Sequence, residues 1–214
     1  MKAVVFVDVQ KDFIDGALGS EWAKKVTPEI IKYAKECRAK GYALYATADT
    51  HQPTEYENGE EIPQAAKGGY LTTLEGKRLP VEHCINGTDG HKIAEGLVKD
   101  ENRDVIIPQG RIFDKPTFGC FQLAEEIADD FRVDQQNEVG DIINEPAILN
   151  EPLDEIQVCG FCTSICVAAN AIILRAKFPN TKITVLGNLC ADVSEENHKA
   201  ARIVLEAQQI DWAE

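Results

Sequence analysis

The feature that most constrains the fold of this chain is a series of short, largely apolar runs that alternate with helical patterns. The run at 3–7 is apolar at every position, which is typical of a strand buried on both faces. Further strands are predicted at 42–48, 104–108, 155–158 and 181–186, with a short extended piece at 111–114. Strands that alternate with helices imply βαβ units and a parallel sheet. We therefore predict the α/β class: a three-layer αβα sandwich around a central, mostly parallel, Rossmann-like sheet.

Helices are predicted from apolar stripes that recur every three or four residues. They span about 28–40, 121–131, 165–178 and 194–208. Thr27 and Pro28 match the preferred N-cap and first residue of the first helix. With 214 residues the chain suits a single domain over 1–214, elaborated by a long loop at about 50–92 and an acidic insertion at about 133–153. A loop that long inside a compact domain is usually functional.

Charge and cysteine content exclude some classes of function. The net charge of −14 argues against binding to nucleic acid or to anionic membranes. No apolar run approaches the length of a membrane span, so no membrane partner is expected. The seven cysteines are an odd number and no signal peptide precedes them, which favours a reducing cytoplasm in which thiols are free for chemistry.

Chemically reactive side chains follow the predicted strands. Asp8 ends the first strand, Asp49 and His51 follow the second, Lys115 follows the third and Cys166 follows the fourth. In parallel α/β sheets, ligands bind beyond the carboxyl ends of the strands. We therefore expect these residues to share one rim of the sheet.

Cys166 is the candidate nucleophile. It stands at the start of a helical pattern, where the helix dipole and backbone N–H groups lower the pKa of a thiol. The alternative is a buried, inert cysteine, and this stretch alone supports both interpretations equally. The nearby Cys159 and Cys162 are not expected to form a redox or zinc motif, because Cys159 lies inside a strand and no second pair exists.

Asp8 and Lys115 are the candidate partners of this thiol. Asp8 follows a buried strand, and desolvation there raises the pKa of a carboxylate, which suits a base. Pro116 restricts the backbone of Lys115 to an extended conformation, so this lysine points in a fixed direction. The alternatives are a carboxylate that caps backbone N–H groups and a solvent-exposed lysine in a turn. For Asp12 we favour the structural role.

Asp49, His51 and His83 are the candidate metal ligands. Alternate residues after a strand share a face, so Asp49 and His51 point to one side. Three N/O ligands that leave an open position suit a zinc, iron or manganese ion. His83 completes the set only if the long loop folds back. Cys84 is a competing soft ligand, whereas His91 is expected at the surface.

With these motifs in place, the chain resembles the isochorismatase-like cysteine hydrolases, and most closely their nicotinamidase/pyrazinamidase branch. The resemblance covers nearly the whole chain and rests on five motifs in the family's order. They are Asp8-Val-Gln-Lys-Asp-Phe, Asp49-Thr-His51, the segment 79–90 that contains His83-Cys84, Lys115, and the segment 160–167 that contains Cys166.

This resemblance implies a triad of Asp8, Lys115 and Cys166, and an oxyanion hole made by the backbone N–H groups of Cys162 and Cys166. It also implies a cis peptide between Phe161 and Cys162. The implied activity is hydrolysis of nicotinamide or a similar small carboxamide, through a thioester, to the acid and ammonia. The implied cofactor is a divalent metal, zinc before iron or manganese, which holds the pyridine nitrogen. A role in pyridine nucleotide salvage and assembly into a homo-oligomer, a dimer or tetramer, are implied as well.

Departures from the family's pattern bear on the substrate. Leu79-Pro80 stands where members often carry an aromatic residue before the proline, and Ser164 stands where an aspartate is common. The candidate substrate contacts are Phe13, Leu79, Phe118 and Phe161, with Phe121 as a further candidate for an aromatic wall. The departures weaken nicotinamide as the substrate more than they weaken a small carboxamide.

Two other functions stay open at this point. One is a metal-independent relative, an isochorismatase-type or N-carbamoyl hydrolase, since true isochorismatases generally lack the Asp49, His51 and His83 triplet. The other is a non-catalytic binding protein on the same scaffold, against which the complete triad argues.

Overall fold

A computed structural model describes residues 1–54, 56–57, 60–61, 69–131 and 152–214. The acidic insertion predicted at about 133–153 lies outside these residues except for its last two positions, as does part of the long loop at 50–92. Within the described residues, no helix combines the length and the apolar character that crossing a membrane requires.

A six-stranded sheet forms the centre of the molecule, and every neighbouring pair of its strands is parallel. In spatial order its strands are β5 (Ile112–Lys115), β2 (Ala43–Asp49), β1 (Lys2–Val7), β6 (Glu155–Phe161), β7 (Lys182–Ala191) and β8 (Asp211–Ala213). β2 and β6 are buried at every residue and β1 at all but its first, as their apolar sequences predict. The predicted fold class is confirmed.

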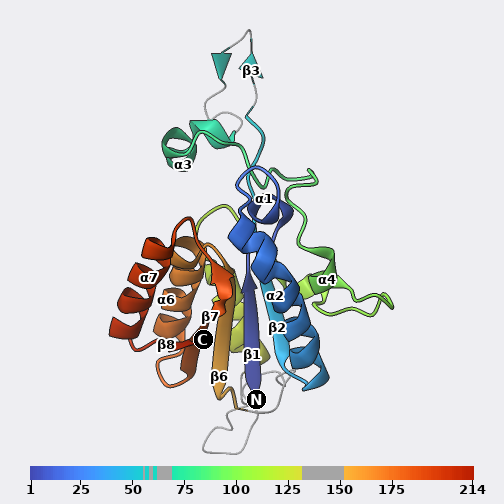
Figure 1. The fold of residues 1–214 in the computed structure, drawn as a ribbon, viewed down its shortest axis with the longest axis vertical. Coiled ribbons are helices and arrows are strands. Elements are labelled where there is room, and N and C mark those ends of the chain that lie inside the picture. Colours follow the sequence, from blue (N-terminus) through green and yellow to red (C-terminus); the bar gives the residue numbers. More distant parts are fainter. Residues whose placement is uncertain (55, 58–59, 62–68, 132–151) are drawn as a thin grey trace, which may run out of the picture.

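Helices cover both faces of this sheet (Figure 1). Helix α2 (Glu21–Ala39) packs against β2, β6 and β7. Helices α5 (Phe121–Asp130), α6 (Ala168–Lys177) and α7 (Glu195–Ala207) pack side by side in the other layer. The strand order reverses direction at β1 and β6, and right-handed crossovers then place the two sets of helices on opposite faces.

Short elements lie beyond the carboxyl ends of the strands (Figure 1). They include α1 (Lys11–Ile14), the 3₁₀ turn η1 (Tyr70–Thr72), α3 (Leu74–Arg78) and the antiparallel pair β3 (Tyr56–Glu57) and β4 (Glu60–Glu61). Helix α4 (Glu95–Val98) packs beside α2, and the 3₁₀ turn η2 (Gln109–Arg111) leads into β5. The predicted long loop therefore carries short helices and turns at the rim where the reactive side chains were expected.

The predicted start of α2 is wrong by about two turns. The helix begins at Glu21, because the Ser20 hydroxyl accepts a hydrogen bond from the Ala23 N–H (3.0 Å) and caps it. Pro28 lies inside the helix, and Thr27 donates its hydroxyl to the Ala23 carbonyl (2.7 Å) instead of capping. Pro28 is on the exposed face, where water can satisfy the carbonyl that loses its partner.

The strand predicted at 104–108 is also wrong. Ile106 and Ile107 are buried, but their N–H groups bond to carbonyls of α4, at Val98 and Leu97, instead of joining the sheet. The short piece predicted at 111–114 supplies the sheet strand, β5. An apolar run thus identifies burial, while its hydrogen-bond partner decides whether it becomes a sheet strand. The three-residue β8 was not predicted.

Candidate active site

The structure brings Asp8, Lys115 and Cys166 into contact. The Lys115 Nζ lies 2.7 Å from Asp8 Oδ2 and 3.6 Å from the Cys166 Sγ. All three are buried, with at most 6% of each residue exposed. The ends of β1 and β5 and the turn after β6 supply them, which is the shared rim that the sequence predicted.

Asp8 is held in an unusual backbone conformation beside β2. Its φ is +50°, and Thr47 donates its hydroxyl to Asp8 Oδ1 (2.6 Å). Gly160 of β6 has a φ of +128° and pairs with Val7, the residue before Asp8. A Cβ at Gly160 would lie 2.1 Å from the Val7 carbonyl oxygen. Only glycine permits β6 to approach β1 this closely at the site.

The ionisation of these groups differs from the sequence prediction in one respect. Burial, followed by the nearby Asp8 carboxylate, raises the pKa of the Cys166 thiol, and the Lys115 charge does not offset this. The prediction of a lowered thiol pKa is therefore wrong, because desolvation is the largest influence on this group. Burial also raises the pKa of Asp8, as predicted. Burial lowers the pKa of Lys115, but the charges of Asp8, Cys166 and Asp49 together outweigh burial, so the net pKa is raised and the ammonium stays charged.

We call residues 162–166 the nucleophile turn. The Phe161–Cys162 peptide is cis, as the family resemblance implied. A single π-helical turn (Thr163–Val167) then leads into α6, where a continuous helix was predicted. Ser164 donates its hydroxyl and its N–H to the two oxygens of Asp192 (2.9 and 2.7 Å). Ser164 stands where the family pattern often has an aspartate, and the Asp192 carboxylate lies next to it.

Asn170 fixes the nucleophile turn from the other side, and sequence reasoning missed it. Its side-chain Nδ2 donates to the carbonyls of Cys166 (2.8 Å) and Phe118 (3.1 Å), and its Oδ1 accepts from the Cys120 N–H (2.9 Å). It is only 1% exposed. One signal could have found it: a single amide inside the apolar stripe of α6, since a buried amide needs partners.

Asp49, His51 and His83 form one cluster in which the candidate ligand atoms all lie within 4.8 Å of one another. All three are buried. The His83 Nδ1 donates to the Val81 carbonyl (2.8 Å), which leaves Nε2 as the acceptor nitrogen that faces Asp49. A carboxylate, two imidazoles and an oriented tautomer fit a divalent metal such as zinc.

Two side chains near the N-terminus, the buried Gln10 and the half-buried Asp12, hold this cluster against the rim. Gln10 accepts the Asp49 N–H at its Oε1 (2.7 Å) and donates Nε2 to the carbonyls of Asp49 (2.9 Å) and His91 (2.7 Å). Asp12 accepts the Cys84 N–H (2.7 Å), so it has the structural role that was predicted. These bonds fold the loop back and bring His83 to Asp49.

The candidate metal ligands and the thiol site are adjacent. The Lys115 Nζ lies 3.6 Å from Asp49 Oδ1. Burial raises the pKa of Asp49, but its close contacts with His51 and His83, together with the Lys115 charge, outweigh burial and hold that pKa well below its usual value. Asp49 is therefore an anion at neutral pH, as a metal ligand must be.

Aromatic residues surround the two histidines. Tyr70, which the sequence analysis missed in the unpatterned loop, lies with its ring centroid 4.6 Å from that of His51 and 5.0 Å from that of His83. Phe13 lies 5.6 Å from His83. The Tyr70 hydroxyl donates to the Leu79 carbonyl (2.9 Å). Leu79 stands where the family pattern often has an aromatic residue, and Tyr70 places an aromatic ring next to that position.

The other predicted substrate contacts are placed unevenly. Phe161 is buried and directly precedes the nucleophile turn. The side chains of Leu79 and Phe118 are partly exposed, at 38% and 47%, and their backbone carbonyls hold Tyr70 and Asn170. Phe121 is 75% exposed at the start of α5.

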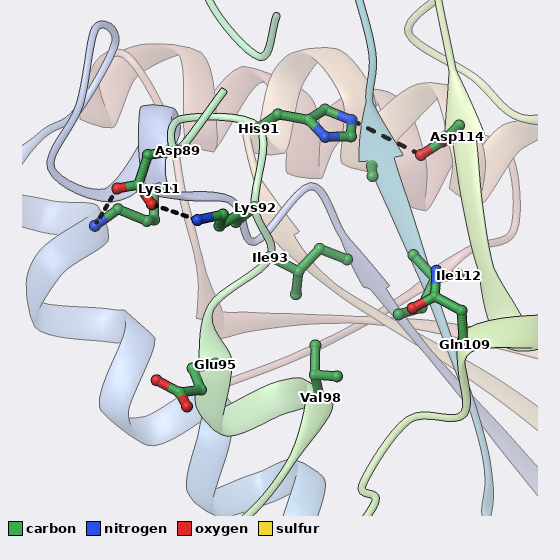
Figure 2. Close-up of a pocket in the computed structure, with 11 residues that line it drawn as sticks. Lys11, Asp89, His91, Lys92, Ile93, Glu95, Val98, Gln109, Ile112 and Asp114 are labelled. Atoms are coloured by element: carbon green, nitrogen blue, oxygen red, sulfur yellow. Dashed lines mark hydrogen bonds and ion pairs between the residues drawn. The ribbon is translucent and has the colours of Figure 1, made fainter. Parts of the chain in front are cut away.

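An open hollow of about 720 Å³ lies between the segment 89–98 and the start of β5 (Figure 2). Its lining carries both signs of charge, including Lys11, Asp89 and Lys92, which form ion pairs with one another (Figure 2). His91 lines it and shares a hydrogen bond with the Thr50 hydroxyl (2.8 Å). The side chain of His91 is 19% exposed, so it is less accessible than the predicted surface residue.

Comparisons with known proteins give a consistent result. A family model described as the isochorismatase domain matches residues 2–214. A sequence search of curated proteins finds no match. Three solved structures share the fold. Pyrazinamidase of Pyrococcus horikoshii in complex with zinc is 19% identical with a TM-score of 0.64, over 100% of this chain and 98% of that one. Nicotinamidase from Bacillus subtilis is 19% identical with a TM-score of 0.67, over 100% and 99%. N-carbamoylsarcosine amidase from Thermoplasma acidophilum is 18% identical with a TM-score of 0.63, over 99% and 95%.

Proposed function

Since this chain belongs to the isochorismatase family, we propose that it is a cysteine amidohydrolase that cleaves nicotinamide, or a similar small carboxamide, to the acid and ammonia. The observation that carries the proposal is the buried contact of one lysine with both a carboxylate and a thiol. Lys115 lies 2.7 Å from Asp8 and 3.6 Å from Cys166. A nucleophile, a base and a cation at these distances are what acyl transfer needs.

Asp8 is the base in this proposal. Burial favours a protonated Cys166 in the resting site, so the thiol proton must leave as the sulfur attacks. Asp8, whose pKa burial raises, accepts that proton and later returns it to the departing nitrogen. Lys115 stays charged and favours the thiolate at the moment of attack.

The nucleophile turn supplies the remaining chemistry. The Cys166 sulfur bonds to the amide carbonyl carbon, and the backbone N–H groups of Cys162 and Cys166 stabilise the oxyanion. The C–N bond then breaks and ammonia leaves with the proton from Asp8. Water hydrolyses the thioester, releases the carboxylic acid and restores the thiol.

We propose that Asp49, His51 and His83 hold a divalent metal, with zinc the first candidate and iron or manganese the alternatives. When bound, the metal supplies an attachment point for a ring nitrogen of the substrate. The aromatic rings of Tyr70 and Phe13 beside the two histidines support a substrate that carries such a ring. The pyrazinamidase with the same fold was solved with zinc.

A metal-independent N-carbamoyl hydrolase is the second candidate, because one structure with this fold is an N-carbamoylsarcosine amidase. The Asp49, His51 and His83 cluster favours the first candidate, since an enzyme without metal has no use for three convergent buried ligands.

Ammonia release from a panel of substrates tests the proposal. The panel contains nicotinamide, pyrazinamide, an aliphatic amide and an N-carbamoyl amino acid, each assayed with the protein as purified, after chelation and after zinc is restored. We expect the aromatic amides to be hydrolysed only with metal present. No ammonia from any substrate would refute the proposal, and activity on the N-carbamoyl compound alone would favour the second candidate.

Two predictions concern the whole molecule. Assembly into a dimer or tetramer is checked by light scattering of the purified protein. A cytoplasmic location and a role in pyridine nucleotide salvage are checked by cell fractionation and by growth of a deletion strain on nicotinamide.

A further inference from the structure

His198, on the first turns of α7, is held in an aromatic cage close to the active site. Its ring centroid lies 5.1 Å from that of Trp22, at the start of α2, and 5.0 Å from that of Trp212, in β8. Its Nδ1 lies 2.8 Å from the Thr163 hydroxyl oxygen. Three separate elements therefore contact this ring, and its Nδ1 binds a residue of the nucleophile turn.

The direction of this hydrogen bond follows from the partners of Thr163. The Thr163 hydroxyl lies 3.1 Å from the Ala191 carbonyl, which can only accept, so its single proton is used there. The His198 Nδ1 must then be the donor. Thr163 is fully buried, so a hydroxyl that lost this donor would have no water to replace it.

Thr163 anchors the nucleophile turn near its start, at the second residue. It directly follows Cys162, and the Cys162 carbonyl accepts the N–H groups of Ile165 (3.1 Å) and Val167 (3.1 Å). Asp192 binds Ser164, and Asn170 binds the carbonyl of Cys166. The hydrogen bonds of the Thr163 hydroxyl therefore fix the start of the turn, next to the proposed oxyanion-hole residue Cys162.

We propose that His198 is a positioning residue that, through Thr163, holds the nucleophile turn in its reactive geometry. Its effect on hydrolysis rests on the function proposed above, whereas its effect on the turn does not. A displacement of the turn moves the sulfur and both oxyanion donors together; since misplacement by about 1 Å costs about 100-fold in rate, a shift of a fraction of that size accounts for a loss of about tenfold. Trp22 of α2 and Trp212 of β8 pack on His198, so through this ring they also support the position of the nucleophile turn.

Paired variants separate the hydrogen bond from the packing. His198→Phe keeps a ring between the two tryptophans but removes the donor, and His198→Asn restores a donor near the Nδ1 position. Thr163→Val removes the acceptor, and Thr163→Ser keeps it. His91→Phe is the matched control, because His91 also bonds to a threonine hydroxyl at 2.8 Å but lines the hollow in Figure 2.

Hydrogen exchange by mass spectrometry reads the turn without any substrate. We expect His198→Phe and Thr163→Val to speed exchange of the 162–167 amides by about tenfold, and exchange in the rest of α6 to stay the same. His198→Asn, Thr163→Ser and His91→Phe are expected to exchange like the wild type in this segment. The double variant H198F/T163V is expected to match T163V, because T163V already removes the bond to His198 together with the bond to the Ala191 carbonyl.

Steady-state kinetics then reads the consequence. We expect His198→Phe to lower kcat by about tenfold with KM changed by less than about twofold, and His198→Asn to recover most of kcat. Unchanged exchange in both His198→Phe and Thr163→Val would overturn the proposal. So would faster exchange with an unchanged kcat. If the wild type hydrolyses no amide, the proposed function fails, while the exchange data still decide whether His198 holds the turn.

Discussion

The two ends of the central sheet both contain buried charge, but they use it differently. At the amino end, Glu155 accepts a hydrogen bond from Thr184 (2.7 Å) and pairs with Lys2 and Lys182, which begin the neighbouring strands. At the carboxyl end, Asp8 lies beside a buried lysine and a thiol. Each carboxylate has a lysine partner, so pairing alone does not distinguish them.

The difference lies in how far each group is desolvated. Burial raises the pKa of Glu155, but hydrogen bonds from Lys2 and Thr184 outweigh it, and the net pKa is lowered. Lys2 and Lys182 are themselves 39% and 55% exposed. Asp8 has no exposure, and burial raises its pKa in spite of Lys115. A solvated ion pair stabilises strands, whereas a desolvated one leaves a carboxylate able to take a proton.

The largest effect is expected from removal of the thiol at the carboxyl end. Cys166→Ala should lower kcat for amide hydrolysis by at least about 1,000-fold, since no other group can form the thioester. The control is Cys37→Ala, a buried cysteine of α2, which should retain activity within about twofold. Ammonia release measures both. Residual turnover by Cys166→Ala near the wild-type rate would remove the thiol from the mechanism.

Removal of the base is the next largest change. Asp8→Asn keeps the shape of the side chain but cannot take the thiol proton, so kcat should fall by about 100- to 10,000-fold. The same change at Asp15, an exposed carboxylate nearby, should leave kcat unaltered. If Asp8→Asn is folded by circular dichroism and fully active, Asp8 is not the base, and the difference in desolvation between the two sheet ends has no catalytic role.

Metal binding tests whether Asp49, His51 and His83, at the carboxyl end of the sheet, form a metal site. We expect one divalent metal per chain by elemental analysis, and His83→Ala should weaken its binding by more than about 100-fold because it removes a ligand directly. His91→Ala should still bind one metal per chain, since His91 lies in the hollow outside the cluster. Equal metal content in both variants would show that the cluster is not the binding site.

The smallest effect is expected at the amino end. Because the folded pKa of Glu155 lies below its unfolded value of about 4.3, its contribution to the free energy of unfolding is fully present above that pH and is lost as pH falls through the lowered folded pKa. Glu155→Gln should cost about 1 kcal/mol at neutral pH, given the exposed lysines, and less near about pH 3.5. Urea unfolding at both pH values measures this. Activity should be unchanged, and a large loss of activity would break the comparison.

Sequence alone determined the fold class and the residues of the rim. Continuous apolar runs identify strands buried on both faces, and the residue that follows such a run must lie at its carboxyl end. Asp8, Lys115 and Cys166 were found this way because their positions depend on local chain order. Gly160 was equally visible in the sequence as the end of an apolar run, and in the structure it is the penultimate residue of β6.

Only the tertiary structure decided which distant groups touch and how they ionise. His83 reaches Asp49 because Gln10 and Asp12 bind the returning loop, and none of these contacts is local in sequence. Asn170, Tyr70 and His198 were missed for the same reason. The pKa of Cys166 was predicted in the wrong direction, because the helix terminus is a local feature whereas desolvation is the sum of everything packed around the sulfur.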